Sequence, residues 1–510
     1  MTNQDTGTSA SQDDKPEKHL YRQVVQGGAW VMVLRIAQQV LALIRLVVLA
    51  RILSPADFGL LGIALLTMRI TRIFTETGFV EALIQRKGDV RPYLNAAWTI
   101  HVVRGLILFG VLYMGAPFLV QCFANPKEAL DVNTATMVFR VLAVTFLLGG
   151  FANIGVVFFS KELEFNKHFL RQICGTLADV VVAVTLALLY RNVWALVWGK
   201  LAGETVQFLL SYMLHPHRPR IHFDWPKIRA LWAYGKWGLG MAVIGFLIME
   251  GDDLLVAKIL GLTPLGLYKV AHTLGWLPIT EVTVAISFVT FPAYAKVQDN
   301  LPRVREAYLK VLQFTAFLSC PLAVMLIVLG EDFTLLFMKA KWRAMVPALQ
   351  LLATMAIFNS LASCTAPLFR AVGRPKIVTY LMFGKLVFLA VLIYPFIHYW
   401  GITGAAAAVL FSTLLNQPLV YYMVVKILGC RYRDFLRVLM SPAAGVLALA
   451  AAVAGVKYIL GTPIGIGAFL LCVVAGMIGY IITVFGFDRI LGLSMKEMIR
   501  EQWKIFRSRK

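Results

Sequence analysis

The chain is divided almost from end to end into long apolar stretches separated by short polar ones. An α-helix needs roughly 20 apolar residues to cross a bilayer. About fourteen stretches of this kind can be counted, which leaves no room for a separate soluble domain. The sequence therefore predicts an all-α, polytopic membrane protein of about 14 transmembrane helices. The stretches lie near residues 25–50, 58–83, 93–121, 135–159, 168–189, 193–214, 233–260, 264–292, 309–330, 344–369, 377–398, 401–425, 438–460 and 464–487.

The formal net charge of +22 raises the alternative of a nucleic-acid-binding protein, so the location of the charges matters. When the loops are numbered alternately, 31 of the 49 Lys and Arg residues lie in the termini and in the loops on their side of the membrane. The opposite loops hold seven, and the other eleven lie inside the stretches. This distribution places both termini in the cytoplasm. It predicts membrane lipids as partners and argues against nucleic acid.

A fifteen-residue segment occurs twice. Ala50–Ala64 (ARILSPADFGLLGIA) returns 207 positions later as Ala257–Ala271 (AKILGLTPLGLYKVA), with six identical residues. The same offset aligns Gly28 with Gly235 and Trp30 with Trp237. Duplicated helix bundles are typical of secondary transporters, in which the substrate site lies between the two halves.

The repeat also predicts the domain organisation. Six apolar stretches precede the second copy, so both copies enter the membrane from the same side as parallel repeats. The last two stretches have no counterpart and form an added pair. We expect a disordered cytoplasmic tail at 1–23, six-helix bundles at 24–214 and 233–427, an interfacial linker at 215–232, an extra transmembrane pair at 438–487 and a basic cytoplasmic tail helix at 488–510.

Charged side chains inside the stretches are the candidates for function, because they are costly in a membrane and face a cavity or one another. The first half carries seven cations and three carboxylates there, whereas the second half carries four of each. Guanidinium groups bind phosphate and carboxylate in a bidentate manner. The first half is therefore predicted to line a cationic cavity for an anionic substrate. The arginines that share helix faces or lie near mid-depth are Arg35, Arg45, Arg69, Arg72 and Arg104.

Local neutralisation is the alternative. Arg72 and Glu76 are four residues apart, as are Lys200 and Glu204, and such pairs can cancel each other on one helix. Arg45 lies near the outer face, where a long side chain can reach the membrane interface.

Carboxylates of the second half form another group of candidates. They could take up a proton or Na⁺ and so couple an ion gradient to transport. The alternative is a hydrated vestibule or structural pairs with Lys258 and Lys269. Asp252 belongs to the same acidic group and aligns with Arg45 of the first half. The candidates for ion coupling are Glu250, Asp253, Glu281 and, in the first half, Asp179.

Patterns typical of metal sites and of catalysis are absent from the sequence. The six cysteines occur singly, in or beside apolar stretches, so we predict neither a metal site nor a cofactor. No phosphate-binding Gly-rich loop is found. The outer loops are too short for the acid and base residues that membrane enzymes of polysaccharide assembly usually carry there. We therefore predict a protein that is not an enzyme.

Several motifs together resemble the polysaccharide transporters of the multidrug/oligosaccharidyl-lipid/polysaccharide exporter superfamily. The resemblance covers about residues 25–430. The motifs are LARILSPADFGLLGIA (Leu49–Ala64), TETGFVEALIQRK (Thr75–Lys87), EGDDLLVAKILGLTPLGLYKVA (Glu250–Ala271), FPAYAKVQDN (Phe291–Asn300) with Arg303 and Tyr308, and FRAVGRPK (Phe369–Lys376).

The resemblance implies two six-helix bundles around a central, often cationic cavity with alternating access. It also implies a flippase of the bacterial inner membrane that moves undecaprenyl-pyrophosphate-linked oligosaccharides for exopolysaccharide, capsule or O-antigen assembly. Polysaccharide polymerase and chain-length proteins are the further partners to expect. The alternatives are a flippase for lipid-linked peptidoglycan precursor, a multidrug exporter, whose cationic drugs suit an arginine-rich cavity poorly, and a membrane enzyme of polysaccharide assembly.

Overall fold

The computed structural model describes residues 14–75, 78–85, 89–123, 131–162, 164–277, 294, 300–461 and 465–491. Every regular element in these ranges is helical. Nine of the described segments are long and apolar enough to cross a membrane. The all-α fold class predicted from the apolar stretches is confirmed.

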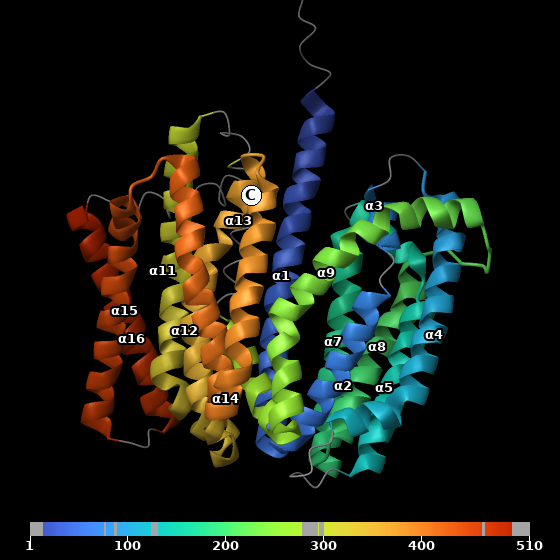
Figure 1. Ribbon diagram of the computed structural model, residues 1–510, viewed down its shortest axis with the longest axis horizontal. Coiled ribbons are helices and arrows are strands. Elements are labelled where there is room, and N and C mark those ends of the chain that lie inside the picture. The colour runs from blue at the N-terminus through green and yellow to red at the C-terminus, as the bar shows by residue number, and fades with distance from the viewer. Residues whose placement is uncertain are drawn as a thin grey trace, which may run out of the picture.

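The first half of the chain forms one group of helices (Figure 1). Within it α7 packs along α8 and α1, and α4 packs along α5. The elements are α1 (Asp14–Ile52), α2 (Pro55–Phe74), α3 (Phe79–Gln85), α4 (Arg91–Phe123), α5 (Val132–Phe151), the short 3₁₀ turn Ile154–Val156, α6 (Val157–Lys161), α7 (Phe165–Tyr190) and α8 (Trp194–Leu214).

The second half forms another group, in which α11 packs on α12 and α15, and α12 packs on α14. A helix at 262–277 belongs to this half as well. The remaining elements are α9 (Trp225–Leu260), α11 (Leu301–Phe333), the π turn η2 (Thr334–Met338), the 3₁₀ segment η3 (Ala340–Met345), α12 (Val346–Ser363), α13 (Thr365–Ala371), α14 (Pro375–Leu428), α15 (Tyr432–Leu460) and α16 (Ile466–Leu491).

The two groups lie side by side and diverge toward the end at which α1 begins (Figure 1). Helix α9 runs between them, because it packs against α2, α3 and α4 of the first group and against α14 of the second. It is continuous from Trp225, so the second part of the predicted linker 215–232 is the start of this helix.

Many helix boundaries follow the apolar stretches closely, but several differ, among them the following three. Helix α1 begins at Asp14, inside the tail that we predicted to be disordered, because residues 14–23 are rich in good helix formers and extend a helix already nucleated by the apolar part. The stretch 58–83 is divided into α2 and α3, with Gly78 between them at a φ of 63°. Helix α14 joins two predicted spans across a kink at Gly401, whose φ is 58°.

The start of α2 explains why the chain turns there. Ser54 and Asp57 form a reciprocal capping box, and Pro55 occupies the first turn, where its missing N–H costs nothing. In the second copy of the repeat the residue aligned with Ser54 is Gly261, which takes a φ of 101° instead. The two copies thus reach the same turn by different chemistry.

Apolar packing joins the halves at this turn. One buried cluster contains Ala50, Leu53 and Ile63 from the first copy together with Leu262 and Leu265 from the second. The added pair, α15 and α16, packs against α11 through a separate cluster that includes Leu329, Leu449 and Tyr480. Among the described residues, the apolar cluster that joins the halves contains none from this added pair.

Candidate functional site

The two copies of the repeat contact each other directly. A Cβ atom at Gly59 would lie 1.8 Å from the carbonyl oxygen of Leu262, and one at Gly266 would lie 1.9 Å from that of Pro55. Gly59 aligns with Gly266 and Pro55 aligns with Leu262, so each copy offers the other the same surface. A reciprocal contact of this kind is expected about a two-fold axis. We call it the repeat contact.

Charged side chains lie within a few helical turns of the repeat contact. Arg69 on α2 pairs with Glu250 on α9, and this ion pair joins the two halves. Lys269 lies 2.7 Å from the other oxygen of Glu250 and 2.5 Å from Asp253. The side chain of Arg69 is 60% exposed, whereas that of Glu250 is 12% exposed. We call Arg69, Glu250, Asp253 and Lys269 the charge cluster.

Two buried aspartates extend the charge cluster into the second half. Asp252 accepts a hydrogen bond of 2.6 Å from the Tyr268 hydroxyl, and Asp253 binds Lys269. The Oδ1 atom of each aspartate has no hydrogen-bond partner among the described residues. Buried oxygens without partners are costly, so a proton or cation on either atom would be stabilising.

Two further arginines meet at the end of α2. Arg104 of α4 donates hydrogen bonds to the Thr75 hydroxyl at 3.1 Å and to the carbonyl oxygen of Arg72 at 2.9 Å. The exposed Arg72 guanidinium lies 6.0 Å from the centre of the Phe146 ring. Arg104 thus satisfies the last turn of α2, the turn that also carries Arg72. We call these two residues the arginine pair.

A sequence model of a family described as polysaccharide biosynthesis protein matches residues 48–347. This range contains both copies of the repeat and more than half of the chain. The chain belongs to this family.

Relatives of this chain are likewise named for the biosynthesis of polysaccharides. The lipopolysaccharide biosynthesis protein WzxC of Escherichia coli K12 is 26% identical over 430 residues, which cover 83% of this chain and 85% of WzxC. The teichuronic acid biosynthesis protein TuaB of Bacillus subtilis is 21% identical and covers 72% of this chain and 77% of its own. The succinoglycan biosynthesis transport protein ExoT of Rhizobium meliloti is 23% identical, with coverages of 65% and 66%.

Solved structures confirm the transporter fold. The lipid II flippase MurJ in an inward closed conformation superposes with a TM-score of 0.74 at 15% identity and covers 90% of this chain and 99% of its own. An inward-facing multidrug transporter of the MATE family gives a TM-score of 0.58 at 17% identity, with coverages of 81% and 98%. This member of the polysaccharide biosynthesis family is accordingly a multi-pass membrane protein with the architecture of these transporters.

The predicted arginines differ in their contacts. Arg45 lies 3.0 Å from Asp179 of α7, and both side chains are about four-fifths buried. This pairing joins α1 to α7, so Arg45 and Asp179 hold the first half together. Arg35 is exposed on α1, and no described contact links it to the other arginines.

Some of the alternatives from the sequence have clear outcomes. Lys200 and Glu204 do form the expected pair, at 2.7 Å. Lys269 pairs with Glu250 and Asp253, as the structural alternative for these carboxylates predicted. Glu76 and Glu281 lie outside the described residues, so the pairing of Arg72 with Glu76 and the role of Glu281 stay predictions.

Sequence reasoning missed the part played by η3. Lys341 donates to the carbonyl oxygen of Leu53 at 2.5 Å, and the Trp342 indole donates to that of Ala50 at 2.8 Å. Both contacts tie the second half to the end of α1 beside the repeat contact. Lys258 makes a similar contact with the carbonyl oxygen of Cys122 at 2.6 Å. In the sequence, a lysine and a tryptophan in a short loop indicate only a position at the membrane interface, not a contact between the halves.

Proposed function

We propose that this protein is a flippase that moves undecaprenyl-pyrophosphate-linked oligosaccharide units across the cytoplasmic membrane for the assembly of a surface polysaccharide. The repeat contact carries this proposal, because it closes one end of a duplicated transporter between two halves of different charge. The family and the relatives named for lipopolysaccharide, teichuronic acid and succinoglycan biosynthesis support this substrate class.

The orientation follows from the charges of the loops. Both termini lie in the cytoplasm if the positive-inside rule holds, and the repeat contact then lies at the outer face. The described arrangement is the state that is closed toward the outside, and separating Gly59 from Gly266 opens it. Alternating access requires that this contact form and break in each cycle.

Cations of the first half hold the diphosphate in this proposal. Arg72 exposes its guanidinium at the end of α2, Arg104 reaches the same end of the helix, and Arg69 lies one turn from Arg72 on the same helix. Guanidinium groups bind phosphate oxygens in pairs of parallel hydrogen bonds. Arg35 contributes charge on α1, whereas Arg45 is not available because it binds Asp179.

The charge cluster then connects substrate binding to the repeat contact. Glu250 forms an ion pair with the Arg69 guanidinium while the outer end is closed. A diphosphate that competes for Arg69 weakens this ion pair and favours opening. A proton on Glu250 or Asp253 acts in the same direction, because it removes the charge that attracts Arg69 and Lys269. Glu250 and Asp253 are therefore our candidates for coupling to an ion gradient, with Glu281 as a further one.

A flippase for lipid-linked peptidoglycan precursor is the second candidate. The superposition on MurJ favours it, because MurJ has a higher TM-score than the MATE transporter described above. The same arginines would serve it, since both substrates carry a diphosphate on a polyprenyl lipid. Loss of a surface polysaccharide on deletion, with an intact cell wall, separates the two.

A leaflet-specific assay tests the function. Inverted vesicles loaded with the lipid-linked oligosaccharide report its transfer to the lumenal leaflet. We expect Arg72→Ala and Arg104→Ala to reduce this transfer, and Arg140→Gln to serve as the control, because Arg140 stacks on Tyr113 away from the arginine pair. Transfer at the wild-type rate in both test variants would refute the role of the arginine pair, and absence of any transfer in wild type would refute the flippase.

A further inference from the structure

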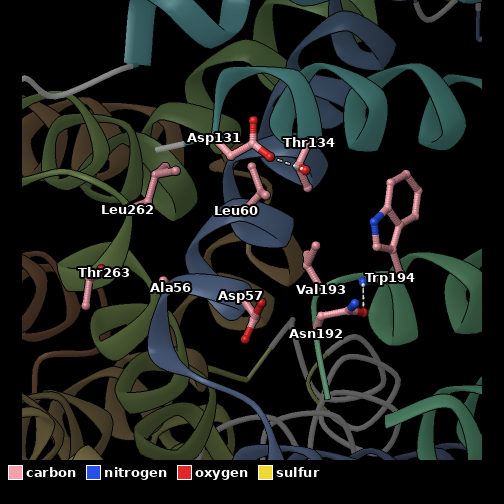
Figure 2. Close-up of a pocket in the computed structure, with 10 residues that line it drawn as sticks. All are labelled: Ala56, Asp57, Leu60, Asp131, Thr134, Asn192, Val193, Trp194, Leu262 and Thr263. Atoms are coloured by element: carbon pink, nitrogen blue, oxygen red, sulfur yellow. Dashed lines mark hydrogen bonds between the residues drawn. The ribbon is translucent and has the colours of Figure 1, made fainter. Parts of the chain in front are cut away.

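A cavity of about 440 Å³ lies beside the repeat contact, at the end of the molecule where α2 begins (Figure 2). Four segments line it: the first turn of α2, the first turn of α5, the turn before α8 and the start of the helix 262–277. The volume is within the range of small-ligand sites. The first three segments belong to one half and the fourth to the other, so the cavity spans the two halves.

The lining combines charge, hydroxyl, amide and aromatic groups. Its charged side chains are Asp57 and Asp131, both acidic, and Thr134 and Thr263 add hydroxyls. Trp194 supplies an indole ring, as Figure 2 shows. An anionic ligand is disfavoured by two carboxylates. A ligand rich in hydroxyl groups is favoured, because each carboxylate can accept several hydrogen bonds and the flat indole covers an apolar face.

Part of the hydrogen-bonding capacity of these groups is already used by helix ends. Asp131 caps α5 by accepting from the backbone N–H of Asn133 at 3.0 Å and from the hydroxyl of Thr134. The latter bond lowers the pKa of Asp131, so this side chain stays a carboxylate well below neutral pH. Asn192 accepts from the backbone N–H of Trp194 at 3.2 Å through its oxygen.

Other atoms of the same residues remain available. Asp57 accepts its capping hydrogen bonds from Ser54 through Oδ2, and its Oδ1 accepts none from the described residues. The amide nitrogen of Asn192 likewise has no acceptor in the described part of the chain. The cavity thus presents a carboxylate acceptor and an amide donor that are held in place by the caps.

A second cavity, of about 430 Å³, adjoins the first and shares Asn192 and Trp194 with it. Its other lining residues are Leu186, Tyr190 and Trp198. The rings of Trp194 and Trp198 lie 6.5 Å apart, and Tyr190 and Trp198 are 64% and 44% exposed. Exposed Trp and Tyr at the end of a transmembrane helix are typical of the membrane interface. The two cavities together lead from the contact between the halves to the lipid surface.

We propose that the cavity between the halves binds the neutral, hydroxyl-rich sugars of a glycan on the outer side of the membrane. This assignment rests on the proposed function for its orientation and for the source of the glycan, which is a lipid-linked unit already delivered to the outer leaflet. The lipid remains in the bilayer beyond the aromatic cavity, and the sugars reach Trp194, Asn192 and Asp57. Since Thr263 comes from the other half, opening of the repeat contact dismantles the site. A bound glycan therefore stabilises the state that is closed toward the outside.

The test is a binding measurement on the full-length protein in nanodiscs, with lipid-free maltotriose as the probe. We expect a saturable change in tryptophan fluorescence in the millimolar range, and roughly tenfold weaker binding in Trp194→Leu, which corresponds to about 1.4 kcal/mol. Asn192→Asp is the second variant, because it keeps the oxygen that accepts from the backbone N–H of Trp194 and removes the amide donor. Trp225→Leu is the control, since Trp225 begins α9, outside the two cavities.

Charge selectivity completes the test. A trisaccharide of glucuronic acid is expected to bind at least about tenfold more weakly than maltotriose. Asp131→Asn, which retains the helix cap, is expected to reduce that difference. Equal maltotriose affinity in wild type, Trp194→Leu and Asn192→Asp, or no saturation in wild type, would overturn the proposal. These outcomes are independent of the vesicle assay, so a flippase without this glycan site and a glycan site without flippase activity are distinguishable.

Discussion

The two copies of the repeat share the glycines of their mutual contact but differ in the charges that they carry. Gly59 and Gly266 remain at matched positions because each approaches a carbonyl oxygen of the other copy too closely for any side chain. Gly62 and Lys269 are also matched, yet one lacks a side chain and the other binds two carboxylates. The glycines at the backbone contact are the same in both copies, whereas the residues that supply the carbonyl oxygens, Pro55 and Leu262, are not.

The difference at that second position has a physical reason. A Cβ at Gly62 would lie 3.8 Å from Cδ2 of Leu265 and 4.0 Å from Cγ of Lys269, so a longer side chain there would compete with both side chains for space. A lysine in both copies would place two ammonium groups against each other across the contact. A symmetric contact that carries charge is therefore more stable with a cation on one side only.

The largest expected effect comes from filling the repeat contact. Gly59→Val or Gly266→Val places side-chain atoms where a carbonyl oxygen now lies, which costs the closed state about 3 kcal/mol and lowers transport roughly a hundredfold. Lumenal access of a thiol reagent to an engineered cysteine at Ala56 should rise at the same time. Gly110→Val is the control, because nothing lies within 4 Å of a Cβ at that position. Unchanged transport in both test variants would show that the contact is not required.

A second prediction concerns the ion pair between the halves. Arg69→Glu is expected to lower transport about tenfold, because it places a carboxylate against Glu250. The exchange Arg69→Glu with Glu250→Arg should recover part of this loss if the pair closes the outer end. A double variant no better than Arg69→Glu would instead assign Arg69 to the substrate alone. The vesicle transfer assay measures both.

The ion pair inside the first half should behave differently. Arg45→Met leaves Asp179 without its partner in a largely buried place, so we expect a loss of roughly 1–3 kcal/mol in stability. Arg45→Met with Asp179→Leu should recover most of that loss, and transport by the double variant should stay near wild type. Thermal unfolding in detergent measures the first effect. Loss of transport in a stable double variant would return Arg45 to the substrate site.

The smallest effect is expected at the start of α5. Hydrogen bonding lowers the folded-state pKa of Asp131, so its cap stabilises the protein fully above the ordinary carboxyl pKa, and this contribution falls as pH drops through the lowered value. On acidification, the melting temperature of wild type should fall slightly more than that of Asp131→Asn, whose cap does not titrate. Parallel melting curves of the two proteins down to pH 3 would contradict this.

The fold could be predicted to a large extent because a bilayer imposes a simple rule on each segment. The stretch 93–121 became α4 (Arg91–Phe123) with hardly any change, since hydropathy alone decides where such a helix lies. The break at Gly78 was not predicted, although Thr75, Glu76 and Thr77 interrupt the apolar pattern just before it. Matched glycines in the repeat were visible in the sequence, but their mutual contact required the second half to be placed.

The candidate site was predictable only as a set of residue types. The arginines of the first half were identified by their rarity in apolar segments, but their partners lie far away in the chain. Arg45 and Asp179 are separated by 134 residues, and Arg69 and Glu250 by 181. Whether an arginine binds substrate or another helix depends on these distant neighbours. The roles of Lys341 and Trp342 were missed because their acceptors also lie far away in the chain. These acceptors are backbone carbonyls, which no residue type reveals.

Helix α9 has a mechanical consequence. It runs for 36 residues, about 54 Å at 1.5 Å per residue, and reaches from α3 and α4 to α14 without a loop. The halves therefore cannot swing on a slack tether, and any rocking must flex a continuous rod. Gly235, Gly238, Gly240 and Gly245 fall within this helix, and glycine is the weakest helix former after proline. The helix is therefore expected to bend most easily near its middle. The free energy of that bending then contributes to how readily the transporter changes the side of the membrane to which it opens.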